Sequence, residues 1–313
     1  MIEVKDGNNR QPGETGFFSG ITNDDYHAAE GVSSSKLGCL IDCPSKYHNI
    51  MKQTNATSIG QAFHSYLLEP DVFKKEYGIL EEPNGVTKAA KEEKKFYTEK
   101  GMLTIKRKDF NIINKMKESV MCDSALKKLF DESLESYVEH SGFWEYTEDG
   151  WENGILCKFR PDYLVKVGGS IIIVDIKTIN SSEPKNIESS IAKRSYHRQA
   201  AFYIDGAKKT FNVDSVAFIN AFIEKPDPNE DVSENNIVEC LPVAIPEYDL
   251  DQGRREYITA LRNKRRFEGF IDPPGYKEMI ALELGKNADE MPFVELGLPY
   301  FKQDDQNRLE RSE

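Results

Sequence analysis

The feature that most constrains the fold is an apolar, β-branched run, residues 170–178, with the sequence SIIIVDIKT. Its Asp175 and Lys177 stand two positions apart, and alternate side chains of a strand leave the same face of a sheet. A buried charge without a partner is expensive, so these two groups must be paired with each other or with something else. The run therefore predicts a buried strand that ends in either a structural ion pair or a functional pair of charges.

Helical and strand patterns alternate along the chain, which indicates a single α/β domain with helical additions. Gly168-Gly169 between two strand patterns predicts a tight hairpin. The domain is predicted to span residues 21–290 with a core at about 134–268, after a loose leader (1–20) and before a polar tail (291–313). Helices are predicted at 58–70, 109–121, 187–209 and 247–267, and strands at 135–147, 154–167, 170–178, 215–224 and 236–245.

The composition excludes some classes of protein. The 313 residues carry a net charge of −12, which argues against a protein that coats nucleic acid through a basic surface. It leaves open an enzyme with a local basic groove. Five cysteines without a CxxC pair, no secretory signal and no run of about 18 apolar residues predict a reduced, cytoplasmic protein that does not enter a membrane.

A second acidic residue precedes the predicted hairpin. Asp162 follows Pro161, and a hairpin closed at Gly168-Gly169 brings its carboxylate near Asp175. Two carboxylates and the backbone carbonyl of Ile176 make an oxygen-rich site suited to Mg²⁺ or Mn²⁺. Lys177 adds a compact cation that can orient water or neutralise developing charge. Pro-Asp followed thirteen residues later by Asp-x-Lys is a far more specific pattern than Asp-x-Lys alone.

This pattern resembles the PD-(D/E)XK nuclease motif, in the RecB-like branch of that superfamily. The short motifs of the sequence are more similar still to those of the RecE family (the C-terminal nuclease domain of exonuclease VIII). The resemblance covers roughly residues 20 to 265, with its motifs in the same order. They are DYHAAEGVSSSKL, CPSKYH, GQAFHSYLLEP, KFRPDYL, VDIKT and YHRQAAFY.

The resemblance implies a restriction-endonuclease-like core, with a mixed central sheet flanked by helices and helical additions at the N-terminus. It implies an Mg²⁺-dependent exonuclease, with Mn²⁺ as a substitute, that degrades the 5′ strand of linear double-stranded DNA and leaves 3′ overhangs. It also implies a RecT-like single-strand annealing partner, a phage or prophage recombination context, and a ring-shaped homo-oligomer, with a tetramer favoured.

The resemblance further implies that His64 is a metal ligand beside Asp162 and Asp175, and that Gln199 and Tyr203 belong to the catalytic set. A neutral imidazole can ligate a divalent ion, although a histidine on a helix is more often structural. Gln199 and Tyr203 are four residues apart and share a helix face. Gln199 is predicted to hold a phosphate or the lysine. Tyr203 is predicted to contact the scissile nucleotide, with core packing as the alternative.

Basic residues near these motifs are candidates for DNA contacts, since phosphate neutralisation needs a local basic footprint. A solvated strand or helix face explains them equally well. The candidates are Lys158, Arg160, Lys193, Arg194 and Arg198.

Two competing functions remain. One is another RecB-like DNA nuclease, either an endonuclease or an exonuclease of different polarity. The other is a DNA-binding or assembly module that has lost catalysis on the same scaffold. The complete set of two aspartates and a lysine argues against the second, and Mn²⁺ affinity that depends on Asp162 and Asp175 distinguishes them.

Overall fold

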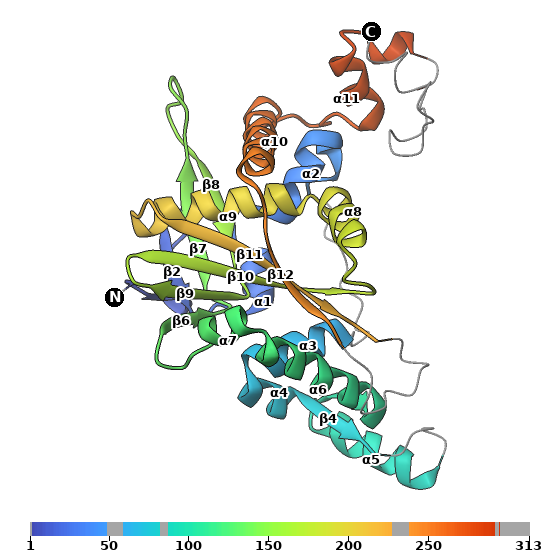
Figure 1. Ribbon diagram of the computed structural model, residues 1–313. Coiled ribbons are helices and arrows are strands. Elements are labelled where there is room, and N and C mark those ends of the chain that lie inside the picture. Colours follow the sequence, from blue (N-terminus) through green and yellow to red (C-terminus); the bar gives the residue numbers. More distant parts are fainter. Residues whose placement is uncertain (1, 49–58, 82–86, 227–237, 292–293, 295–313) are drawn as a thin grey trace.

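The computed structural model describes residues 2–48, 59–81, 87–226, 238–291 and 294 (Figure 1). The strands are β1 (Lys5–Asp6), β2 (Gly16–Ser19), β3 (Val32–Ser33), β4 (Tyr77–Leu80), β5 (Leu103–Lys106), β6 (Glu135–Val138), β7 (Ser141–Tyr146), β8 (Ile155–Phe159), β9 (Tyr163–Val167), β10 (Ser170–Ile179), β11 (Val216–Glu224) and β12 (Cys240–Ala244). The α-helices are α1 (Asn23–Ala28), α2 (Ser34–Asp42), α3 (Ile59–Leu68), α4 (Pro70–Glu76), α5 (Lys88–Glu99), α6 (Arg107–Cys122), α7 (Ser124–Leu129), α8 (Pro184–Arg194), α9 (Tyr196–Phe211), α10 (Glu247–Arg266) and α11 (Tyr276–Glu283). Short 3₁₀ turns lie at Gly7–Asn9, Pro44–Lys46 and Ala288–Glu290.

Two five-stranded sheets organise the molecule. The central sheet has the strand order β12-β11-β10-β9-β6, and the second sheet has the order β1-β2-β7-β8-β3. In the central sheet β10 and β11 are parallel, whereas the other neighbours are antiparallel. The predicted mixed α/β architecture is confirmed. No helix in the described ranges is long and apolar enough to cross a membrane.

Helices cover both faces of the central sheet (Figure 1). On one face, α9 packs on the sheet, with α10 and α2 beyond it, in a core that includes Ile173, Phe202 and Phe218. On the other face α3 and α6 pack over Val174 and Ile223. The alternation of side chains along β10 and β11 therefore feeds two separate cores.

The predicted hairpin is present, and its first loop residue explains why glycine is needed there. Val167 of β9 pairs with Ser170 of β10, which leaves a loop of two residues. Gly168 has a φ of 60°, in the left-handed region that favours glycine. The helices predicted at 58–70, 109–121 and 247–267 correspond to α3, α6 and α10.

Four predictions about the elements are wrong. The strand predicted at 135–147 is two strands in different sheets, β6 and β7. The strand predicted at 154–167 is two strands in different sheets, β8 and β9, because the chain bends at Pro161. The helix predicted at 187–209 is α8 and α9, separated by Ser195 with a φ of 53°. The predicted loose leader contributes β1 and β2, and its Phe17 and Phe18 are buried. Residue 58, residues 236–237 and most of the predicted tail (292–293 and 295–313) lie outside the described residues.

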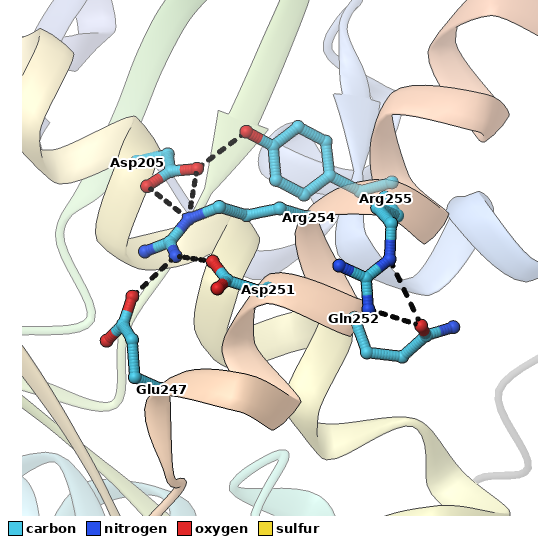
Figure 2. A network of polar contacts seen from close by, with 7 residues as sticks. Asp205, Glu247, Asp251, Gln252, Arg254 and Arg255 are labelled. Atoms are coloured by element: carbon cyan, nitrogen blue, oxygen red, sulfur yellow. Dashed lines mark hydrogen bonds and ion pairs between the residues drawn. The ribbon is translucent and has the colours of Figure 1, made fainter.

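Helix α10 holds α9 in place through a network centred on Arg254 (Figure 2). Its guanidinium donates to Asp205 of α9 at 3.2 Å and to Glu247 and Asp251 of α10 at 2.7 and 2.8 Å. The hydroxyl of Tyr257 donates to the same Asp205 at 2.6 Å. A partly buried guanidinium with three carboxylate partners ties the two helices together, and α9 carries the predicted residues Gln199 and Tyr203.

Candidate active site

The predicted site lies where β10 extends beyond the end of its pairing with β9. Pairing between these strands stops at Val174, which is opposite Tyr163, while pairing with β11 continues to Ile179. The N–H of Ile171 donates toward the β11 side, so the N–H and C=O of residues at even positions face the β9 side. Beyond Val174 that side is open. The carbonyl of Ile176 therefore faces an edge that none of the strands in the described ranges covers.

Asp162 occupies this open edge. It sits at the bend where the chain leaves the second sheet after β8 and enters the central sheet at β9. Its Oδ2 accepts the N–H of Ile176 at 2.6 Å, in the place where a strand partner would have been. His64 of α3 approaches from the other side, with Nδ1 3.6 Å from the same oxygen. The bend at Pro161 thus delivers the first predicted carboxylate to the strand that carries the second.

Asp175 is almost entirely buried, and Lys177 is its ionic partner. Gln199 of α9 donates to Asp175 Oδ1 at 3.2 Å. Burial raises the pKa of Asp175 to about 6; Lys177 opposes this rise, and Asp162 adds to it. Burial disfavours the charge on Lys177, but the carboxylates of Asp175 and Asp162 outweigh it and raise the pKa of Lys177. The strand therefore holds a buried ion pair, in which each residue stabilises the charged form of the other.

A groove of about 880 Å³ runs past this pair. His64, Ile176 and Lys177 form part of its wall, whereas Asp162 and Asp175 lie directly behind these three residues. Tyr196 and Arg194, from the junction of α9 and α8, line the groove near Lys177, whose Nζ is 4.7 Å from the centroid of the Tyr196 ring.

Carboxylates line another part of the groove. Glu139 lies at the second crossing between the sheets, between β6 and β7, and its backbone N–H donates to the carbonyl of Asp162 at 3.2 Å. Its carboxylate accepts from Arg160 at 2.9 Å. Burial, with Asp162 adding to it, raises the pKa of Glu139 to about 7 against the opposing charge of Arg160. Glu69 and Glu76 also line the groove.

The donor chemistry of the site suits a hard divalent cation, although the ligands are not gathered around one point. Among the described residues, no three His, Cys, Asp or Glu side chains lie in a ligating arrangement. The oxygen atoms are nevertheless present. They are the carboxylate of Asp162, which accepts the N–H of Ile176, the carboxylate of the preceding residue Asp175, and the carbonyl of Ile176. Oδ2 of Asp175 is buried and accepts no hydrogen bond, although Lys177 is its ionic partner. An acceptor in that state fits a cation.

The structure places both predicted residues of α9 beside the strand that carries Asp175. The amide of Gln199 donates to Asp175. Tyr203 is only 6% exposed and packs on Phe159, and its hydroxyl donates to the carbonyl of Arg160 at 3.2 Å. The alternative of core packing therefore holds for Tyr203. Through that hydrogen bond it supports the bend that presents Asp162.

The predicted DNA contacts fall into three groups. Arg160 and Arg194 line the groove, and Lys193 is exposed beside it on α8. Arg198 is paired with Glu256 of α10 at 3.3 Å. The prediction for Lys158 is wrong: it is 4% exposed, and its ammonium donates to the carbonyls that end α1, Tyr26 at 2.6 Å and Ala29. Burial, with Arg10 and Lys36 adding to it, lowers the pKa of Lys158 to about 8.

Sequence reasoning missed two residues at the site. Glu139 sits in the stretch YVEHSGF, and nothing in that pattern distinguishes it from a surface glutamate. Asn220 is fully buried in β11, opposite Asp175 in the strand register. The signal for Asn220 was present, because AFINAFIE places an amide within an apolar strand just as IIIVDIKT places an aspartate.

A comparison with a solved structure agrees with this fold. The crystal structure of a "Putative exonuclease" from Eubacterium rectale is similar with a TM-score of 0.50 at 13% identity, covering 90% of this chain and 97% of that chain. That of a phage related exonuclease from Haemophilus somnus 129PT has a TM-score of only 0.29 at 12% identity, covering 77% of this chain and 96% of the other. No curated protein matches.

A family model covers both aspartates and the lysine. The model for a PDDEXK-like domain of unknown function (DUF3799) matches residues 33–237, which include α3, β10 and α9. The matched range is well over half of the chain. The chain therefore belongs to this family of PDDEXK-like domains.

Proposed function

We propose that this protein is a divalent-metal-dependent deoxyribonuclease that acts on the ends of linear double-stranded DNA. The observation that carries the proposal is the junction of Asp162, Asp175 and Lys177 at the open edge of β10, beside a groove. Membership of the PDDEXK-like family supports a phosphodiester hydrolase. The fold shared with a protein described as a "Putative exonuclease" supports action from ends.

The residues of the chain divide the work. Asp162, Asp175, the carbonyl of Ile176 and His64 would hold the cation, Mg²⁺ with Mn²⁺ as a substitute. When bound, such an ion polarises a phosphate oxygen and lowers the pKa of water. Gln199 orients Asp175 from the α9 side.

Lys177 changes partner in this proposal. In the structure its ammonium neutralises the buried Asp175. With a divalent cation held by the carboxylates, the ammonium of Lys177 would be free to face the groove, whose wall it already forms. There it stabilises the negative charge that develops on the scissile phosphate and orients the attacking water. Burial of Asp175 makes this exchange favourable, since the carboxylate needs one cation or the other.

The direction of digestion follows the family resemblance. We propose that the protein degrades the 5′ strand and leaves 3′ overhangs for a RecT-like annealing protein, as a ring-shaped homo-oligomer in which a tetramer is favoured. The acidic part of the groove is consistent with a strand end near the site, because the carboxylates of Glu69 and Glu76 repel a continuing phosphate backbone.

The test uses linear duplex DNA labelled at the 5′ or the 3′ end, with Mg²⁺, beside a closed circular duplex. We expect early release of the 5′ label, an intact circle, and no release by Asp175→Ala. Cutting of the circle would make the protein an endonuclease on the same scaffold. Failure to cut any substrate with Mg²⁺ or Mn²⁺ would favour the binding or assembly module.

A further inference from the structure

A buried amide beside the predicted metal ligand has no hydrogen-bond partner. Seven buried side-chain nitrogen or oxygen atoms of the described residues lack such a partner, and three of them belong to Asp175 and Asn220. Both polar atoms of the Asn220 side chain are unpaired, and its side chain is fully buried. Buried polar groups are paired in the large majority of cases, so an amide with neither bond made calls for an explanation.

The strand register places Asn220 against Asp175. The two residues are partners in the parallel pair of β10 and β11, so their side chains leave the same face of the central sheet. That face is the one covered by α9, because Asp175 binds Gln199 there. The next residue of β11, Ala221, belongs to the core on the opposite face.

The packing of α9 narrows the position further. Tyr196 packs on Phe222 with ring centroids 6.0 Å apart, and Tyr203 packs on Phe218 at 5.8 Å. Asn220 lies between the two phenylalanines on β11. Gln199 lies between the two tyrosines on the same face of α9. The only amide on this part of β11 therefore lies beneath the turn of α9 that binds Asp175.

The unpaired atoms are chemically complementary. Oδ2 of Asp175 is an acceptor without a hydrogen bond, and Nδ2 of Asn220 is a donor without an acceptor. Gln199 uses one hydrogen on Asp175 Oδ1. The side-chain amide of Gln199 has a second hydrogen, which is available to Asn220 Oδ1, since a primary amide carries two. In this structure Lys177 is the ionic partner of Asp175 Oδ2, so a hydrogen bond from Asn220 Nδ2 to that oxygen is not required.

We infer that Asn220 is a positioning residue, which holds the Asp175 carboxylate in the orientation that binds a divalent cation. When Lys177 turns to the groove, Nδ2 of Asn220 donates to the carboxylate from within the sheet, while Gln199 donates from α9. The carboxylate is then fixed by two amides and keeps its remaining lone pairs for the cation. This inference rests on the proposed function, since it assigns a role within the same site.

The test measures Mn²⁺ binding and stability separately. Asn220→Leu removes both unpaired atoms. We expect its free energy of unfolding in EDTA, measured with urea, to equal or exceed that of the wild type, because the substitution removes a buried amide that makes no hydrogen bond. We expect its Kd for Mn²⁺, measured by titration calorimetry, to rise about tenfold, the usual effect of losing a residue that orients a ligand. With DNA, kcat should fall and KM should stay unchanged.

Two further variants keep the result decisive. Ile223→Val trims the other face of the same strand and should leave Mn²⁺ affinity unchanged. Asn220→Ser keeps a donor, and it should bind Mn²⁺ more tightly than Asn220→Ala; equal affinities would overturn the inference even if Asn220→Leu failed to fold. Wild-type Mn²⁺ affinity in Asn220→Leu would also overturn it. Should the wild type itself show no Mn²⁺ binding that depends on Asp175, the proposed function fails instead.

Discussion

The two central strands β10 and β11 contribute to both faces of the central sheet, yet the two faces differ in the side chains that they bury. Toward α3 and α6, the buried side chains of β10 and β11 are apolar, such as Val174 and Ile223. Toward α9 they present Asp175, Lys177 and Asn220 among the apolar residues. Alternation along a strand makes this division possible, because adjacent residues serve opposite faces.

This difference separates the buried residues that stabilise the fold from those that do not. An apolar face gains from every buried methylene group. A buried ion pair contributes little net stability, since the desolvation of two charges offsets their attraction, and a buried unpaired amide is unfavourable. The three polar positions therefore lower the stability of the α9 face. Their presence is best explained by the site at the end of β10.

Removal of the Lys177 ammonium from the α9 face should give the largest effect on activity and on stability. Lys177→Met should lower kcat on the order of 10³-fold, since it removes the charge that stabilises the scissile phosphate. It should also lower the free energy of unfolding in EDTA by about 3 kcal/mol at pH 8, because Asp175 is left buried and charged. Cleavage of labelled duplex DNA and urea unfolding measure the two effects. A variant with normal kcat would remove Lys177 from the mechanism.

The pH dependence identifies the cause of the lost stability. The folded pKa of Asp175 is raised to about 6 from an ordinary value of 3.8, so the folded state binds more protons than the unfolded state between these values. The cost of the bare carboxylate therefore appears as the pH rises and is small at pH 5, where Asp175 is protonated. Asp175→Asn/Lys177→Met should recover most of the stability at pH 8 without recovering activity. A loss that is equal at pH 5 and pH 8 would contradict this explanation.

The apolar face should behave in the opposite way. Ile223→Ala should lower the free energy of unfolding by about 3 kcal/mol, since it removes buried methylene groups and leaves a cavity. Its kcat per folded molecule and its Mn²⁺ affinity should match the wild type. Urea unfolding and calorimetry at a temperature where the variant remains folded provide the comparison. A selective loss of Mn²⁺ affinity would show that the two faces are not independent.

The faces to which the side chains of β10 point were predictable from the sequence, because successive side chains of a strand alternate between the two faces. Asp175 and Lys177 were expected to share a face, and they form an ion pair. The hairpin at Gly168-Gly169 was expected from its turn chemistry, and it is present. Asp162 was expected near Asp175, and the N–H of Ile176 joins the two residues. Each of these inferences depends on residues that are close in sequence.

The rest of the site depends on contacts that local patterns do not encode. The bend at Pro161 moves the chain from one sheet to another, so the apparent strand at 154–167 is two strands and Lys158 turns inward to α1. Glu139 reaches the groove only because the second crossing between the sheets lies beside the first. Whether a basic residue is buried or lines a groove is decided by such tertiary packing.

A change of charge at the groove surface should have the smallest effect, which sharpens the contrast with the buried charges of the α9 face. Arg194→Ala removes a cation that lines the groove near Lys177 and should raise KM for duplex DNA about threefold with kcat unchanged, as an exposed charge contributes on the order of 0.6 kcal/mol. The neighbouring Lys193, also on α8, is exposed but does not line the groove, so Lys193→Ala is the matched control and should leave KM unchanged. The loss in Arg194→Ala should shrink as salt is raised, with the slope of log affinity against log salt reduced by about one. Equal increases in KM for the two variants would mean that DNA responds to the total charge of α8. The position of Arg194 in the groove would then have no specific effect.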